Sequence, residues 1–161
     1  MVIILMGVSG AGKSTVGRLL ARELDWQFFD ADDLHPPANV EKMRQGIALE
    51  DNDRWPWLTA VRAVIEAVLA GLDSAVIACS ALKRAYRQML VIDPARVRIV
   101  YLKGDRRLIE SRLAQRTNHF MSRGLLSTQF ETLEEPVDAL MVDVRSTPAA
   151  IVSRIRRQLG L

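Results

Sequence analysis

The sequence has few of the features that would suit a secreted or membrane protein. It contains one cysteine in 161 residues, Cys79, so no internal disulfide can form, which is typical of a protein of the reducing cytosol. No apolar run approaches the roughly 20 residues of a membrane-spanning helix. The apolar N-terminal stretch has no basic segment before it and no cleavage site after it, so we expect a strand there and not a signal peptide. These absences predict a cytoplasmic protein with no membrane partner.

The chain also lacks the features of a multidomain protein. It has no internal repeat, no low-complexity tract and no linker. With 161 residues, 49% hydrophobic and 25% charged, it can bury roughly 70% of its unfolded surface around one core. We therefore expect a single domain over residues 1–161.

The excess of positive charge is small. A net charge of +3 and an isoelectric point near 9.4 would permit a nucleic-acid partner. However, the densest basic cluster, Arg154, Arg156 and Arg157, lies near the end of a predicted helix, where cations complement the helix dipole. No RNA-binding motif or basic groove with interleaved aromatic residues accompanies it. We therefore expect no nucleic-acid partner.

Several catalytic arrangements are missing as well. The sequence has no cluster of Cys and His at metal-ligand spacing and no pattern of a catalytic triad. The string Asn-Lys-x-Asp, which recognises the guanine base, is also absent, and this argues against a GTPase.

The sequence does contain a phosphate-binding loop. The string Gly7-Val-Ser-Gly-Ala-Gly-Lys-Ser14 follows the apolar run Val2–Met6, so the loop leaves a predicted strand and enters a predicted helix, as phosphate binding requires. Lys13 would reach the β- and γ-phosphates as a catalytic residue, and the Ser14 hydroxyl would hold Mg²⁺. The loop predicts ATP and Mg²⁺ as cofactors. The predicted nucleotide-binding residues of the loop are Gly7, Val8, Ser9, Gly10, Ala11, Gly12, Lys13, Ser14 and Thr15.

Short apolar runs alternate with amphipathic stretches along the rest of the chain. This alternation predicts an α/β fold of the P-loop NTPase type, with a parallel five-stranded sheet flanked by helices. The predicted strands are Val2–Met6, Gln27–Phe29, Ala75–Cys79, Val97–Leu102 and Ala139–Val142. The predicted helices cover about Lys13–Leu24, Asn39–Gln45, Trp55–Ala70, Lys83–Leu90, Leu108–Arg116 and Ala149–Leu159.

One segment, residues 117–135, breaks the alternation because polar residues mix there with scattered apolar ones. A segment of this length in a compact domain is typical of a lid over an active site. The alternative is a surface excursion with one or two short helices.

Two carboxylates, Asp30 and Asp32, come just past the second predicted strand. If the extended geometry persists for two more residues, both point to the same side, toward the phosphates. Asp30 is then the candidate Mg²⁺ ligand, and Asp32 the catalytic residue that positions or deprotonates the attacking hydroxyl. The alternative is a turn rich in Asp, which suits turns.

Polar residues near the ends of other predicted strands are candidates for binding a substrate. His35 could hydrogen-bond a polyol or be structural. Arg54 lies near a predicted helix N-terminus, where a cation opposes the dipole, so we expect it to face an anion. Lys83 and Arg87, four residues apart, would share a helix face and form a carboxylate clamp, or else a solvated basic face.

Neighbouring residues have local interpretations. Asp51 and Asp53 are expected to cap the helix that follows. Trp55 and Trp57 are expected to pack, and Cys79 to be a small buried residue.

Two arginines, Arg112 and Arg116, share a predicted helix face just before residues 117–135. Arginines in this place neutralise charge on a transferring phosphoryl group. We expect Arg116 to act in this way and Arg112 to bind the nucleotide, although either could instead cover the adenine.

Taken together, these segments resemble the gluconokinase family, relatives of shikimate and nucleoside-monophosphate kinases. The resemblance runs in order from residue 6 to residue 134, and its specific parts are Leu34-His-Pro36, Asp53-Arg-Trp-Pro-Trp-Leu58 and Cys79-Ser-Ala-Leu-Lys83. Further matching segments are Met6–Ser14, Asp30–Asp33, Asn39–Met43, Asp51–Asn52, Tyr86–Arg87, Tyr101–Gly104, His119–Met121, Thr128–Glu131 and Leu133–Glu134. Three positions depart from the family pattern: Ala31, Ala48 and Asn118.

The resemblance implies ATP-dependent phosphorylation of D-gluconate at its 6-hydroxyl, a closing lid and a homodimer. It implies contacts to gluconate or the lid for His35, Arg54, Lys83, Arg87, His119 and Gln129. Two alternatives stay open, a kinase of another small acid such as shikimate or a related sugar acid, and a P-loop module that acts on nucleic acid. The pairs Asp30/Asp32 and Lys83/Arg87 favour a small anionic polyol over a polymer.

Overall fold

The computed structural model describes residues 1–115 and 123–161. Its sheet has the strands β1 Val2–Met6, β2 Gln27–Asp30, β3 Ala75–Ala78, β4 Val97–Lys103 and β5 Leu140–Asp143, in the spatial order β2-β3-β1-β4-β5. Every neighbouring pair is parallel. The α/β class and the five-stranded parallel sheet expected from the sequence are therefore confirmed.

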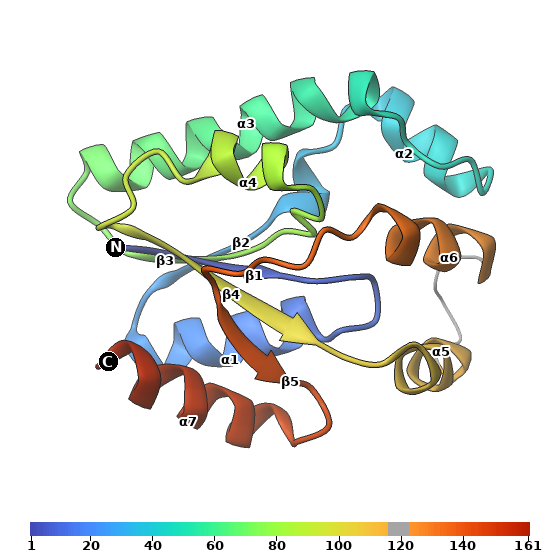
Figure 1. Ribbon diagram of the computed structural model, residues 1–161. Coiled ribbons are helices and arrows are strands. Elements are labelled where there is room, and N and C mark those ends of the chain that lie inside the picture. The colour runs from blue at the N-terminus through green and yellow to red at the C-terminus, as the bar shows by residue number, and fades with distance from the viewer. Residues whose placement is uncertain (116–122) are drawn as a thin grey trace.

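Helices cover both faces of the sheet, with α3 and α4 on one face and α1 and α7 on the other (Figure 1). Parallel strands must be joined by crossovers, and these helices provide them. The described helical elements are α1 Lys13–Leu24, the 3₁₀ helix η1 Ala31–Leu34, α2 Pro37–Arg44, α3 Asp51–Ala70, α4 Arg84–Leu90, α5 Arg106–Ala114, α6 Arg123–Thr132 and α7 Pro148–Leu159. None of them is long and apolar enough to span a bilayer.

The central strand β1 is buried on both faces. Its residues alternate between the two layers, because Val2, Ile4 and Met6 pack in the cluster under α3 and α4. Ile3 and Leu5 pack in the opposite cluster with α1 and α7. The continuous apolar run in the sequence is therefore explained by a strand between two helical layers.

Helix α3 begins at Asp51, four residues before the predicted start at Trp55. A capping box closes its N-terminus, because the Glu50 side chain accepts from the backbone of Asp53 while Asp53 accepts from the backbone N–H of Glu50. Pro56, which favours a helix start in the sequence, lies within this helix. The capping role expected for Asp53 is confirmed in this form, whereas Asp51 does not cap the helix.

Other boundaries differ by one or two residues. Helix α2 begins at Pro37 instead of Asn39, because proline suits the first helical position. Helix α5 begins at Arg106 instead of Leu108, since the Asp105 side chain accepts from the backbone N–H of Leu108 and caps it. In the described part of residues 117–135, helix α6 runs over Arg123–Thr132 and no strand is present.

Candidate active site

The loop between β1 and α1 has the backbone that phosphate binding requires. Gly12 lies in the left-handed region at φ 93° and immediately precedes α1, which begins at Lys13 as predicted. Gly7, at φ 148°, lies so close to β4 that a Cβ there would be 2.8 Å from the carbonyl oxygen of Leu102. Glycine at these positions lets the loop curve over the end of the sheet, with the first N–H groups of α1 at its centre.

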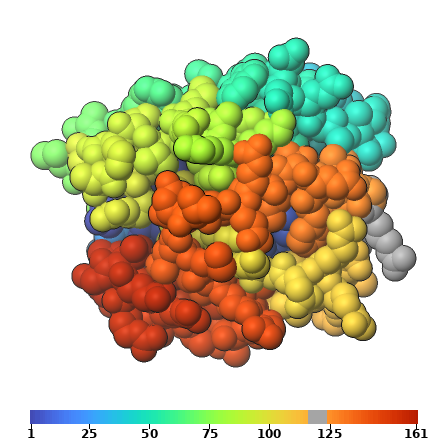
Figure 2. All heavy atoms as spheres, viewed as in Figure 1, coloured from blue at the N-terminus to red at the C-terminus, as the bar shows by residue number. Residues whose placement is uncertain are grey.

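The side chains of Lys13 and Gln129 hydrogen-bond to the loop itself. The Lys13 Nζ donates to the carbonyl oxygens of Gly7 and Val8, at 3.0 and 3.1 Å. Gln129 Oε1 on α6 accepts from the backbone N–H of Ser9, at 2.7 Å. Gln129, which was expected to contact the substrate or the lid, thus binds the phosphate loop in this structure. Residues 123–135 lie between α2 and α5 on the face of the molecule shown in Figure 2.

Ser14 and Asp30 form the polar pair expected of a magnesium site. The Ser14 hydroxyl donates to Asp30 Oδ2 at 2.6 Å, although the two residues come from α1 and the end of β2. Among residues 1–115 and 123–161, no group of three His, Cys, Asp or Glu side chains could enclose a metal. A hydroxyl and one carboxylate fit Mg²⁺ that takes its remaining ligands from phosphates and water.

The extended geometry assumed for Asp30 and Asp32 is wrong. The chain turns into η1 at Ala31, because the Asp30 side chain accepts from the backbone N–H of Asp32 and caps the 3₁₀ helix. The two carboxylates therefore do not alternate along a strand. Asp32 lies on the exposed side of this turn, with 74% of its side chain accessible.

His35 is held against the core beside Asp32. Its ring stacks on the Trp57 indole at 4.4 Å between centroids, and the Trp57 Nε1–H donates to the carbonyl oxygen of Ala31. Trp57 is buried, as expected for a packing residue. Burial, and secondarily the positive charge of Arg54, lowers the pKa of His35 from 6.5 to about 4, so the ring is neutral at physiological pH.

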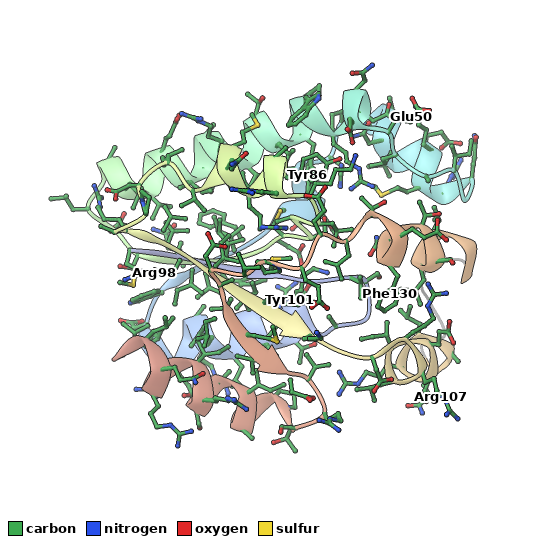
Figure 3. The ribbon with its side chains drawn as sticks, viewed as in Figure 1. Glu50, Tyr86, Arg98, Tyr101, Arg107 and Phe130 are labelled. Atoms are coloured by element: carbon green, nitrogen blue, oxygen red, sulfur yellow. The ribbon has the colours of Figure 1, made fainter. Side chains whose placement is uncertain are left out.

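A polar pocket of about 390 Å³ opens where α3 begins. It is lined by Leu49, Glu50, Asp51, Asn52, Arg54, Lys83, Tyr86 and Thr132. Arg54 is 9% exposed and its Nε donates to the carbonyl oxygen of Leu49 at 3.2 Å. Arg54 and Lys83 therefore line one pocket, and Tyr86 and Glu50 lie on the same side of the sheet (Figure 3).

Asp51 is the centre of the charge network in this pocket. Its carboxylate accepts from the Lys83 Nζ at 2.7 and 2.9 Å and from the Tyr86 hydroxyl. The hydrogen bond from Lys83, followed by that from Tyr86, lowers the pKa of Asp51, whereas burial and then the bond to Asp51 raise the pKa of Tyr86. Sequence reasoning predicted Lys83 as a site residue but missed Asp51 and Tyr86. Asp51 and Lys83 are 32 positions apart, and no local periodicity links them.

The predicted clamp of Lys83 and Arg87 on one helix face is wrong. Helix α4 begins at Arg84, and Lys83 is its extended N-cap residue, so the two side chains do not share a helical face. Arg87 is buried, and its Nη1 donates to the carbonyl oxygens of Ala81 and Leu82 at 3.0 and 2.9 Å. Arg87 therefore supports the loop that carries Lys83.

A second pocket, of about 420 Å³, adjoins the phosphate loop. It is lined by Gly10, Ala11, Gly12, Thr15, Val16, Arg112, Gln115, Ser146, Pro148 and Ile151. Arg112 borders this pocket and its Nη2 donates to the carbonyl oxygen of Val144 at 2.5 Å. The position fits a nucleotide base and sugar beyond the phosphates. Arg116 and His119 lie outside the described residues.

Comparisons with known proteins identify relatives of this chain. Residues 2–136 match the family model described as "AAA domain". The chain is 44% identical to the thermoresistant gluconokinase of Escherichia coli over 94% of this chain and 89% of that protein. It is 40% identical to a probable gluconokinase of Xenopus tropicalis, over 99% of this chain and 93% of that protein. The chain belongs to the gluconokinase family.

Solved structures extend the likeness to three dimensions. A gluconokinase from Sinorhizobium meliloti superposes with a TM-score of 0.83 at 43% identity, covering 98% of this chain and 94% of that one. A shikimate kinase from Aquifex aeolicus, at 21% identity and a TM-score of 0.60, covers 99% of this chain and 96% of that one and shares the fold alone. Membership of the gluconokinase family thus confirms the resemblance noted in the sequence.

Proposed function

We propose that this protein transfers the γ-phosphoryl group of ATP to the 6-hydroxyl of D-gluconate, giving 6-phosphogluconate and ADP. Family membership is the main support. The observation that carries the proposal in the structure is the pocket in which Arg54 and Lys83 supply positive charge and Asp51 a polar acceptor. Charge and hydrogen-bonding capacity of this kind suit a sugar acid.

The phosphate loop would hold the triphosphate. Residues 7–15 would bind its oxygens through backbone N–H groups, with Lys13 between the β- and γ-phosphates. Mg²⁺, when bound, would be held by Ser14 and, through water, by Asp30, and it would neutralise charge on the phosphates. Arg112 borders the pocket proposed for the base, and we assign Arg116 to the transferring phosphoryl group.

The substrate would lie between this loop and the pocket at the start of α3. Arg54 and Lys83 would bind its carboxylate, and Arg87 would act indirectly by holding the loop before Lys83. His35, Gln129 and His119 would contact hydroxyl groups or close over them. Asp32, exposed on η1, would orient the attacking hydroxyl and accept its proton late in transfer. Catalysis would then consist mainly of positioning and charge neutralisation.

An ADP-release assay over several acceptors tests the proposal. D-Gluconate should support the fastest turnover among gluconate, other aldonates, shikimate and nucleoside monophosphates. Lys13→Ala should abolish the gluconate-dependent rate while circular dichroism and thermal unfolding stay close to wild type, because Lys13 contacts loop carbonyls and not the core. If shikimate or another acid is phosphorylated faster than gluconate, that acid and not gluconate is the substrate.

The assay also addresses the proposals on partners. Added DNA or RNA should leave the rate unchanged, and stimulation by either would favour a nucleic-acid-linked function. We further propose a cytoplasmic homodimer of single-domain subunits, which sedimentation and cell fractionation would test.

A further inference from the structure

A buried asparagine on α2 lies within hydrogen-bond distance of His35, a contact that neither a motif nor the family name indicates. Asn39 is 3% exposed, and its Nδ2 lies 2.8 Å from the carbonyl oxygen of Asp53 and 3.3 Å from His35 Nδ1. A carbonyl oxygen only accepts, so the group that faces Asp53 must be the amide NH₂. This fixes the orientation of the Asn39 side chain.

The orientation of Asn39 decides the state of the imidazole. An NH₂ group has two hydrogens and no acceptor, so its second contact, His35 Nδ1, must supply a lone pair. A neutral imidazole with a lone pair on Nδ1 carries its hydrogen on Nε2. The stacking on Trp57 keeps the ring in its plane, and the hydrogen bond from Asn39 to Nδ1 favours this orientation over the ring flipped by 180°.

The ring therefore presents an N–H group toward Asp32. His35 Nε2 lies 4.0 Å from Asp32 Oδ1, too far for a direct hydrogen bond. Two hydrogen bonds that meet at one hydroxyl oxygen place their outer atoms about 4 to 4.6 Å apart. A single hydroxyl group could accordingly accept from His35 Nε2–H and donate to Asp32.

We propose that Asn39 is a positioning residue, which fixes His35 as a hydrogen-bond donor at Nε2 so that the attacking hydroxyl accepts from His35 and directs its own hydrogen to Asp32. The functional part of this inference rests on the proposed phosphoryl transfer, whereas the tautomer does not depend on any substrate. With the opposite tautomer, the lone pair of Nε2 would face the hydroxyl oxygen, and the O–H would turn toward the ring and away from Asp32.

The charged groups around the ring are consistent with a neutral imidazole. Asp32 on η1 faces Nε2, and burial, followed by the positive charge of Arg54 on α3, lowers the pKa of His35. The Lys42–Asp53 ion pair, at 2.7 Å, joins α2 and α3 beside Asn39. It offers a matched control for the docking of α2.

The first experiment is a ¹⁵N NMR measurement of the His35 ring in the wild-type protein without ligands. We expect the pattern of an Nε2–H tautomer at neutral pH, with assignment by comparison with His35→Gln. An Nδ1–H tautomer in the wild type would overturn the proposal, whatever the substrate proves to be. This readout also separates failure of the proposal from failure of the proposed function.

The second experiment reverses the hydrogen bond with Asn39→Asp, whose carboxylate can only accept. The ring should then carry its hydrogen on Nδ1 at neutral pH, and kcat should fall about tenfold with the KM for ATP unchanged. Lowering the pH should restore part of the rate, because the doubly protonated ring again has a hydrogen on Nε2. Lys42→Met should keep the wild-type tautomer and kcat.

A double-mutant comparison distinguishes positioning from a general loss of structure. On the His35→Gln background there is no ring to orient, so adding Asn39→Asp should change kcat by less than about twofold. A full tenfold loss on that background would mean that Asn39 acts through the fold and would overturn the proposal.

Discussion

Several polar side chains of this site already hydrogen-bond to one another or to the backbone. Lys83 is bound by Asp51, Ser14 by Asp30, and Lys13 by carbonyl groups of its own loop. A ligand must therefore replace or share existing hydrogen bonds. Mutations at these residues remove an interaction with the ligand and also alter a partner that remains.

Asp30, which ends β2, and Asp32 on η1 should have separable roles. Asp32→Asn keeps the shape of the side chain but cannot accept the proton of the attacking hydroxyl, so we expect kcat to fall about 10²- to 10⁴-fold with little change in ATP affinity. Asp30→Asn should instead raise the Mg²⁺ concentration needed for half-maximal rate, because Asp30 pairs with Ser14. Steady-state kinetics over a range of Mg²⁺ measure both effects.

Asp33→Asn is the matched control for this pair, since Asp33 is exposed on the same turn. Its kinetics should match the wild type. A loss below about tenfold in Asp32→Asn, together with an altered Mg²⁺ requirement, would mean that the two roles are exchanged.

Arg54 and Lys83 should act mainly on the affinity for gluconate. Each provides a charge-assisted hydrogen bond worth about 1.5–3 kcal/mol, so Arg54→Ala should raise the KM for gluconate roughly 10- to 150-fold. Lys83→Ala should raise the KM for gluconate at least as much, because it also leaves the Asp51 carboxylate without its ammonium partner and next to the substrate anion.

The control is Arg62→Ala, which breaks an exposed ion pair with Glu66 on the same helix as Arg54. Its KM for gluconate should stay within about twofold of wild type. If Arg54→Ala and Lys83→Ala weaken ATP binding and spare gluconate, the substrate pocket has been assigned wrongly.

Whole elements were easier to predict than their junctions. The five strands follow from apolar runs bounded by polar residues, and α1 from its amphipathic pattern after the glycine loop. The errors lie where a side chain redirects the backbone, as Asp30 does by capping η1 and Glu50 by capping α3. The Asp51–Lys83 pair escaped prediction because it depends on how the loop before α4 approaches the start of α3.

Helix α6 should be sensitive to the hydrogen bond between Gln129 and the phosphate loop. Gln129→Leu removes the acceptor for the Ser9 N–H, so amide hydrogen exchange over residues 123–132 should accelerate in the ligand-free protein. A phosphoryl oxygen no longer has to replace Gln129 at this N–H, and ATP should bind up to about fivefold tighter.

Ser127→Ala, on the same helix and without contact to the loop, should leave ATP affinity unchanged. In the wild type, nucleotide with gluconate should increase the protection of residues 123–135. Equal exchange with and without both ligands would contradict a closing role for this segment.

At the scale of the whole molecule, the buried histidine should make stability depend on pH. The folded state holds the pKa of His35 near 4, whereas the unfolded chain binds a proton at about 6.5. The unfolded state therefore gains protons first as the pH falls from 6.5 to 4, and the free energy of unfolding should decrease by up to about 3 kcal/mol, less what solvent screening removes.

Urea unfolding at pH 7.0 and pH 4.5 measures this loss. His35→Gln should remove most of it, because the carboxylates of Asp51, Asp53 and Asp143, whose pKa values are lowered, protonate only at more acidic pH. If the free energy of unfolding of His35→Gln falls between pH 7.0 and pH 4.5 by as much as that of the wild type, other groups cause the effect.

The strand order has a consequence for how the polypeptide acquires its structure during synthesis. Strands β1 and β2 are not neighbours, because β3 pairs with both of them. The Ser14–Asp30 hydrogen bond therefore joins helix α1, which follows β1, to the end of β2, although β1 and β2 share no ladder partner until Ala75–Ala78 has been made. The outer side of β1 needs Val97–Lys103 in addition. A nascent chain that ends before residue 97 exposes one edge of its most apolar strand, and this stage of translation is where we expect the greatest need for a chaperone.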